Sequence, residues 1–483
     1  MKTSIYLQLI AMLCIAAHDV HSQNEVEALR YSTCDPALSA RSMGMNGAYS
    51  AVGVDMSSFF CNPAGLAVYK RTNIEGALEH NSHLTESTYT GESHKELKSR
   101  LSIGNAGFVA VRGTRSPHWK NISYGIAFAK TNNFYQNFTI EGKAETTIMQ
   151  QFAWQAQGIA PADLYNTYSF TAGPAYEVYG IDPADEAGTY YVPATFGLAH
   201  QTKRIQREGR QNETSFALAG NLEDRIFIGG SLNITGIYFT ELTNYTESYA
   251  SDARVSSVSF NEDLTTSGTG FAAHVGIIYK AKDWLRISAS HQTKTATYLQ
   301  DIYSSKALSE VGIDSYASES PQLNSDYSLR SPAKSTFGAA GIVGKYGIVS
   351  IDYETADYTR IRMKGTDANT YDYKAENQLY QQIFRRTNQL RIGIESRILS
   401  TYYVRAGYGI QQHPFSDEAA AIHAAINSWS VGVGYRDDHF FADMALRSYK
   451  VASTYYLYDP ALVQPATVND RATKVMLSVG FRF

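Results

Sequence analysis

The feature that most constrains the fold of this chain is a period-two alternation of apolar and small or polar residues. Residues 429–435 read WSVGVGY, which places the apolar and aromatic side chains from Trp429 to Tyr435 on one face. The segments QLRIGIES (389–396) and YYVRAGYGI (402–410) follow the same pattern. Successive side chains of a β-strand point to opposite faces, so this period predicts strands with one apolar face.

Fourteen segments follow this alternation and predict an all-β chain. They span residues 72–82, 99–113, 119–132, 208–220, 225–243, 265–280, 284–299, 326–343, 346–362, 386–397, 401–412, 427–436, 439–455 and 471–483. Their connections alternate between short ones (221–224, 281–283, 344–345, 398–401, 436–438) and long ones (133–207, 244–264, 300–325, 363–385, 413–426). A soluble sandwich has no reason for this alternation, whereas outer-membrane barrels combine short periplasmic turns with long extracellular loops. We therefore predict a 14-stranded antiparallel transmembrane β-barrel.

Charged residues fall on the small and polar face of the predicted strands. In a soluble sandwich this face would be the solvated one, whereas in a barrel it lines the lumen. The predicted lumen charge network contains Arg391, Glu395, Arg405, Asp443 and Arg447. Because Glu395 and Arg405 flank a short turn, we expect them to form a cross-strand pair.

The two ends of the chain fit export to the outer membrane of a Gram-negative bacterium. Lys2 and the apolar residues 5–17 form a signal peptide, with cleavage expected near residue 22. The last strand is amphipathic and ends on Phe483, a signal that we expect the barrel-assembly machinery to recognise. The 35 tyrosines suit a membrane–water boundary, so outer-membrane lipid is an expected neighbour. A net charge of −4 without a basic patch argues against nucleic-acid binding, and we expect a monomer.

Residues 23–71 precede the first strand and are rich in glycine, alanine, serine and methionine. A barrel of fourteen strands is wide enough to conduct unless something fills it. We therefore predict three parts: the signal peptide 1–22, an N-terminal hatch formed by residues 23–71, and the barrel 72–483. The alternative is that residues 23–71 form an ordered periplasmic tail.

Within this hatch, Asn62, Pro63, Ala64 and Gly65 are the candidate gate residues. Asn62 is held away from the helical region by the following proline, and Pro63 suits the first position of a helical turn. The Asn62 side chain can cap that turn or donate its amide to a wall strand. The alternative is a simple capped turn without a gating role.

The stretch ARSMGMNGAYSAVGVDMSSFFCNPAGLAVYK (40–70) resembles the hatch of the FadL/TodX family of outer-membrane hydrophobic-compound transporters. Its NPAGLA (62–67) is similar to the Asn-Pro-Ala signature of that family, and segments 268–293, 329–343 and 404–415 carry further similarity. The resemblance implies fourteen strands, a plug that contacts a kinked wall strand, and passive transport of hydrophobic molecules. Long-chain fatty acids are the substrate class it implies first.

Two long connections contain candidate ligand-binding residues for an apolar molecule. Ile148, Phe152 and Trp154 lie in a predicted helix, in which the first two share one face. A second helix is predicted over 417–428, capped by Ser416, with Ile422 and Ile426 on one face. The alternative is that both sets of residues only form the small apolar core of their own loop.

Cys34 and Cys61 lie in an exported chain, where a disulfide between them would stabilise the hatch. The alternative is two buried thiols that pack as small apolar groups.

No motif indicates an enzyme, a cofactor or a metal site, since the twelve histidines show no metal-ligand spacing. Two other functions stay open for the barrel. A general diffusion porin would use one long loop as its constriction, and a structural or adhesive barrel would use its loops to bind a partner.

Overall fold

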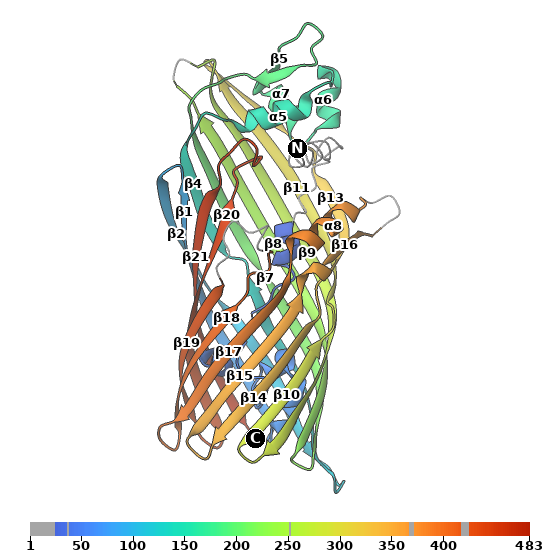
Figure 1. Ribbon diagram of the computed structural model, residues 1–483, viewed down its shortest axis with the longest axis vertical. Helices are drawn as coiled ribbons and strands as arrows, with labels where there is room; N and C mark the ends of the chain where they lie inside the picture. Colours follow the sequence, from blue (N-terminus) through green and yellow to red (C-terminus); the bar gives the residue numbers. More distant parts are fainter. Residues whose placement is uncertain (1–24, 36–37, 251–252, 367–370, 417–424) are drawn as a thin grey trace, which may run out of the picture.

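The computed structural model describes residues 25–35, 38–250, 253–366, 371–416 and 425–483, and these form one closed antiparallel β-barrel (Figure 1). The barrel closes where β1 (Asn73–Tyr89) pairs with β21 (Ala466–Arg482). The predicted signal peptide lies outside the described residues. None of the described helices is long and apolar enough to cross a membrane.

The predicted count of fourteen strands is confirmed, and each predicted segment overlaps one position of the wall. Eleven positions are occupied by one main strand each: β1, β2 (Glu92–Gly113), β3 (Trp119–Asn133), β7 (Ala199–Leu222), β8 (Ile226–Ser248), β9 (Val255–Lys282), β17 (Arg386–Arg397), β18 (Tyr402–Gln411), β19 (Ile426–Arg436), β20 (Phe440–Tyr455) and β21. Three positions are interrupted and consist of two strands: β10 (Leu285–Gln292) with β11 (Ala296–Val311), β13 (Leu323–Arg330) with β14 (Lys334–Val343), and β15 (Gly347–Asp357) with β16 (Arg362–Gly365).

The alternation of side chains agrees with the predicted faces. On β19, Trp429, Val431 and Val433 are 49–56% exposed on the outer surface, whereas Ser430 is 2% exposed inside. An outward apolar band of this kind is what the hydrocarbon of a bilayer covers.

The two ends of the barrel differ as predicted. The short turns and the C-terminus lie at one end, and three helices lie beyond the other end (Figure 1). We refer to these as the short-turn end and the long-loop end. At the long-loop end several strands are longer than predicted. β9 begins at Val255 because it continues to pair with β8 and β11 beyond the band of apolar residues.

The long-loop end is covered by a small cap. It contains α5 (Ile148–Ala156), α6 (Pro161–Thr167), α7 (Ala172–Glu177) and a two-stranded sheet of β5 (Ile181–Pro183) and β6 (Tyr191–Pro193). Two further strands at this end, β4 (Gln136–Ala144) and β12 (Asp314–Glu319), extend the wall. The helix predicted over Ile148–Trp154 is confirmed as α5, with Thr147 as its N-cap.

The helix predicted over 417–428 is wrong at its C-terminal end. Ile426 is the first residue of β19 and pairs with Gln411 of β18, because this pairing satisfies its backbone groups within the wall. Residues 417–424, and with them Ile422, lie outside the described residues. The connection between β16 and β17 contains α8 (Lys374–Ile383), and the short turn η2 (Tyr358–Arg360) lies between β15 and β16.

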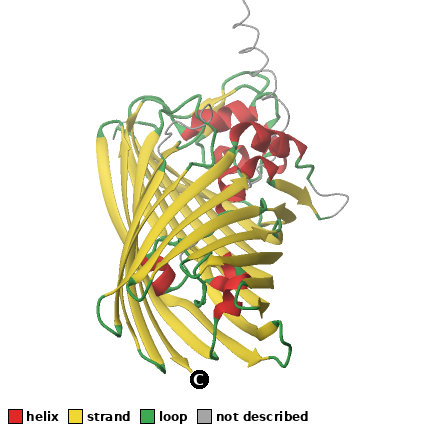
Figure 2. Ribbon diagram, turned by 60° about the horizontal axis from the view of Figure 1, so that its bottom comes forward, coloured by secondary structure: helices red, strands yellow, loops and turns green. Residues whose placement is uncertain are grey.

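The N-terminal segment runs through the interior of the barrel. It forms α2 (Glu25–Arg30), α3 (Ala40–Gly44), α4 (Ser58–Cys61) and η1 (Pro63–Val68). Figure 2 shows short helices enclosed by the strands in the half of the barrel near the short-turn end. Most residues between Leu38 and Tyr69 are buried, and they contact β7, β8 and β9 on one side and β18, β19 and β20 on the other.

Candidate functional site

The Asn62 side chain fastens the start of η1 to both the N-terminal segment and the wall. Its Oδ1 accepts a hydrogen bond from the Ala64 N–H at 3.1 Å, which makes Asn62 the N-cap, with Pro63 as the first residue of the turn. Its Nδ2 donates to the carbonyl oxygens of Ser50 at 2.9 Å and of Ile277 on β9 at 3.5 Å. The cap and the wall contact predicted from the sequence are therefore both present.

Two cross-strand glycines let this turn lie directly against the wall. Gly229 of β8 is paired with Gly276 of β9. A Cβ on Gly276 would overlap the Asn62 Oδ1, and one on Gly229 would overlap the Pro63 carbonyl group. Gly65 approaches the backbone of Gly53 in the same way, and the Val54 N–H donates to the Gly65 carbonyl at 3.2 Å.

Because of this close approach, we expect a methyl group added at Gly276 to lower the stability of the protein, whereas one added at a glycine without close neighbours should not. Gly276→Ala should lower the free energy of unfolding by about 1–3 kcal/mol, because the added Cβ must displace the buried Asn62 amide. The measurement is urea-induced unfolding of the protein in lipid vesicles. Gly236→Ala on β8 is the matched control, because no atom lies within 4 Å of its added Cβ. Equal stability of the two variants would contradict the proposed contact.

Asp352 of β15 holds a second part of the N-terminal segment. Its Oδ2 accepts the N–H groups of Tyr49 and Ser50, both at 2.9 Å, and its Oδ1 accepts the Ser50 hydroxyl at 2.7 Å. Asp352 is 1% exposed, so all of these bonds are shielded from water. Arg391 lies beside it and binds Glu354 at 3.1 Å.

Glu395 of β17 forms the third attachment and joins the segment to the wall charges. Arg41 of α3 binds both of its carboxylate oxygens, with Nε at 2.8 Å and Nη2 at 2.7 Å. The predicted pair is present as well, because the Arg405 Nε donates to Glu395 at 2.6 Å. Arg405 pairs in turn with Asp443 at 2.8 Å, and Asp443 with Arg436 at 2.6 Å.

The predicted single charge network is therefore divided into three groups. Glu395, Arg405 and Asp443 belong to one group, and Arg391 belongs to a second group with Asp352 and Glu354. The third group is centred on Asp35 of the N-terminal segment, which pairs with Arg447 and with Lys474, the latter at 3.4 Å. Sequence reasoning missed Arg41 and Asp35, although a charge within a run of small residues is a signal for a buried partner.

The predicted disulfide is absent, since Cys34 and Cys61 are both free thiols. They line the same cavity of about 50 Å³, but their backbones are fixed by different parts of the wall. The Asp35 N–H donates to the Thr131 carbonyl of β3 at 2.7 Å, and the Cys61 carbonyl accepts from Ser290 of β10 at 2.7 Å. Lys334 Nζ lies 2.8 Å from the Cys34 sulfur. Burial raises the pKa of the Cys61 thiol to about 12, so Cys61 is uncharged at neutral pH.

The candidate ligand residues of α5 occupy two different environments. Ile148 and Phe152 are 5% and 1% exposed and belong to the core of the cap, where the Phe152 ring lies 4.9 Å from that of Phe260. Trp154 is 49% exposed on the opposite face of the helix. Ile426 is the first residue of β19 and is not a member of the core cluster of the cap.

A large apolar cluster lies inside the half of the barrel near the long-loop end, and sequence reasoning missed it. Tyr31, which follows α2, packs edge-on against Phe134 and Phe239 with ring centroids 6.0 and 6.1 Å apart. Ala28 of α2 also belongs to the cluster. The other members are buried aromatic and aliphatic residues from wall strands and from the region of α8: Ile237, Leu264, Leu299, Tyr303, Tyr327, Leu329, Ala356, Tyr358, Ile361, Met363, Tyr373, Tyr380 and Phe384. These residues form an apolar cluster at this level, with charged groups beside it: the Arg30 guanidinium lies 4.0 Å from the centroid of the Phe239 ring.

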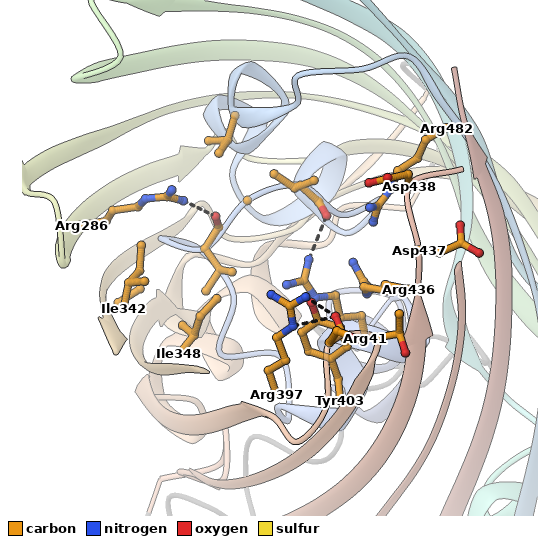
Figure 3. A pocket seen from close by; sticks show the side chains of 17 residues that line it. Arg41, Arg286, Ile342, Ile348, Arg397, Tyr403, Arg436, Asp437, Asp438 and Arg482 are labelled. Atoms are coloured by element: carbon orange, nitrogen blue, oxygen red, sulfur yellow. Dashed lines mark hydrogen bonds between the residues drawn. The ribbon is translucent and has the colours of Figure 1, made fainter. Parts of the chain in front are cut away.

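A cavity of about 570 Å³ opens between the N-terminal segment and the wall at the short-turn end (Figure 3). Five arginines line it: Arg41, Arg286, Arg397, Arg436 and Arg482. Arg286 donates to the Val52 carbonyl and Arg397 to the Ser400 carbonyl, each at 2.7 Å. Within the described part of the chain, no ion pair to a carboxylate is found for Arg286, Arg397 or Arg482. Asp437 and Asp438 also line the cavity, so the arginines without an ion pair leave only a small excess of positive charge there. An anionic group that binds beside these arginines would be stabilised by that excess.

Solved structures of hydrophobic-compound transporters share this architecture. The chain matches the toluene transporter TodX of Pseudomonas putida with a TM-score of 0.56 and 12% identity, over 93% of this chain and 99% of TodX. It matches a Pseudomonas aeruginosa FadL homologue with a TM-score of 0.57 and 11% identity, over 94% and 100% of the two chains. The chain has the fold of the FadL/TodX transporters.

A third match to a protein with the FadL/TodX fold is the toluene transporter TbuX of Ralstonia pickettii, with a TM-score of 0.50 and 15% identity over 94% of this chain and 100% of TbuX. No family model and no curated protein matches the chain. The resemblance expected from residues 40–70 is thus confirmed for the fold.

Proposed function

We propose that this protein is an outer-membrane transporter of hydrophobic small molecules, closed by a hatch that residues 23–71 form. One observation carries the proposal: most residues between Leu38 and Tyr69 are buried inside the barrel near the short-turn end, and Ala28 and Tyr31 of the same segment join the apolar cluster nearer the long-loop end. A general diffusion porin has a water-filled lumen instead. We propose that the transport is passive and driven by the concentration gradient of the cargo.

The proposed route runs from the cap at the outer surface to the arginine-lined cavity at the periplasmic end. Exposed Trp154 offers a first contact, and the buried apolar cluster around Tyr31 and Phe239 lies within the barrel along the proposed route. The arginines of the cavity favour cargo with an anionic head, which makes long-chain fatty acids the proposed substrate class. The structures with the FadL/TodX fold include proteins described as toluene transporters, and hydrocarbons are the alternative cargo.

Uptake into vesicles tests this function. The intact protein, reconstituted in liposomes, should carry a fluorescent fatty acid inward while it excludes small sugars in a swelling assay. Trp154→Ser should slow fatty-acid uptake several-fold, because a large apolar contact surface is lost at the proposed entry point. It should leave the stability of the barrel unchanged, because Trp154 is outside the core of the cap.

Trp284→Ser is the matched control for this experiment. Trp284 has a similar exposure of 56% but lies at the short-turn end, so its loss should leave uptake unchanged. Rapid swelling of the intact protein in sugar solutions would contradict the proposal and identify a diffusion porin.

A further inference from the structure

A cluster of histidine and carboxylate side chains at the long-loop end lies apart from the hatch and the proposed route. One nitrogen or oxygen atom from each of Glu92, Glu141 and His200 lies within 4.8 Å of the other two. The Glu141 carboxylate also contacts two histidines: His94 Nε2 lies 2.9 Å from one of its oxygens, and His200 Nε2 lies 2.9 Å from the other.

The cluster is assembled from three separate segments of the chain. Glu92 and His94 lie at the start of β2, directly after the tip of the β1–β2 hairpin. Glu141 and His200 lie on the paired strands β4 and β7, where Glu141 is opposite Thr202 and His200 is opposite Lys143. Figure 1 shows β1, β2 and β4 side by side near this end of the barrel. No sequence spacing could have revealed the group, because its members come together only when the hairpin docks.

The docking of the hairpin is specific. The Lys143 N–H donates to the Thr90 hydroxyl at 3.2 Å, and a Cβ on Gly142 would overlap that same hydroxyl. The hairpin tip is therefore held against β4, and this places Glu92 beside Glu141. Glu141 and His200 keep 26% and 39% of their side-chain surface exposed, so an ion can enter from solution.

The donor set matches one class of metal ion. Imidazole nitrogen together with carboxylate oxygen is a common set for Zn²⁺, whereas Ca²⁺ and Mg²⁺ require mainly oxygen ligands. Ligand atoms of tetrahedral zinc lie about 2.0–2.2 Å from the metal, which separates them from one another by about 3.4 Å. The three donor atoms are already within 4.8 Å, so they need to approach by no more than about 1.5 Å, which side-chain rotation can supply.

We propose that Glu92, Glu141 and His200 bind a zinc-class divalent cation and thereby tie the β1–β2 hairpin to the β4–β7 wall. His94 orients Glu141 as a positioning residue, because it donates to or shares a proton with one oxygen of that carboxylate. With two carboxylates and one neutral imidazole, the site supplies two negative charges to a dication and leaves a fourth position for water.

Calorimetric titration of the purified, detergent-solubilised full chain with Zn²⁺ tests the site. One Zn²⁺ should bind per chain, and Ca²⁺ should not compete. Glu92→Gln and His200→Ala should each weaken zinc binding by about 100-fold or more, and His94→Ala by about 10–100-fold, as expected for an outer-shell partner. Heat-dependent migration in SDS gels verifies that each variant barrel is folded.

His118→Ala is the matched control. His118 also contacts a carboxylate, Glu223, at 2.6 Å, but this exposed pair lies at the short-turn end outside the cluster. The control should bind Zn²⁺ as the intact protein does. If the intact protein binds no Zn²⁺, if Ca²⁺ binds equally well, or if folded Glu92→Gln or His200→Ala retains the original affinity, the proposal is overturned and the cluster is a set of ion pairs only.

Discussion

Deletion of residues 25–60 should convert the closed barrel into a conducting pore. These residues include Arg41, Tyr49 and Ser50, which attach the N-terminal segment to Glu395 and Asp352 of the wall. A wall of fourteen strands encloses a wide interior, so once this segment is removed water and ions can enter. In planar bilayers we expect steady single-channel current from the deletion variant and little or none from the intact protein.

The control for this experiment is a deletion in the cap, outside the lumen of the barrel. Deletion of residues 184–190, the tip of the β5–β6 hairpin in the cap, should leave the conductance at the low level of the intact protein. Steady conductance of the intact protein would exclude closure by residues 23–71. A closed deletion variant would show that another part of the barrel blocks the path.

Glu395→Gln should produce the largest loss of stability from a single substitution in the wall. Glu395 is 3% exposed and is the shared partner of Arg41 and Arg405. Removal of its charge leaves two buried guanidinium groups without their common anion, which costs about 3–5 kcal/mol. Urea-induced unfolding in lipid vesicles measures this loss, and conductance should rise in the same variant because Arg41 no longer holds α3.

An exposed ion pair of similar geometry provides the control. Glu208 lies 2.8 Å from Lys98 but is 51% exposed, so Glu208→Gln should change the free energy of unfolding by less than about 1 kcal/mol. If the two substitutions had the same small effect, the buried charges of the lumen would contribute nothing to the attachment of the N-terminal segment.

The sequence by itself determined the wall of this protein, because the wall depends on local periodicity. The period of two identified all fourteen strand positions and their outer faces, since a strand alternates its side chains wherever it lies. The Glu395–Arg405 pair was predictable for the same reason, because a short turn sets the register of the two strands it joins. The cap of Asn62 on η1 was equally local, since it involves only its own neighbours in the chain.

The tertiary structure alone decided what lies inside the wall. Arg41 meets Glu395, and Asp35 meets Arg447, across more than 350 residues of sequence, and no local pattern sets such contacts. Cys34 and Cys61 remain free because β3 and β10 fix the backbones on which they lie. Glu92, Glu141 and His200 converge only because the β1–β2 hairpin docks on β4. In each case the packing of one folded segment against another brings the side chains together. Periodicity specifies only the face of a strand on which a side chain lies.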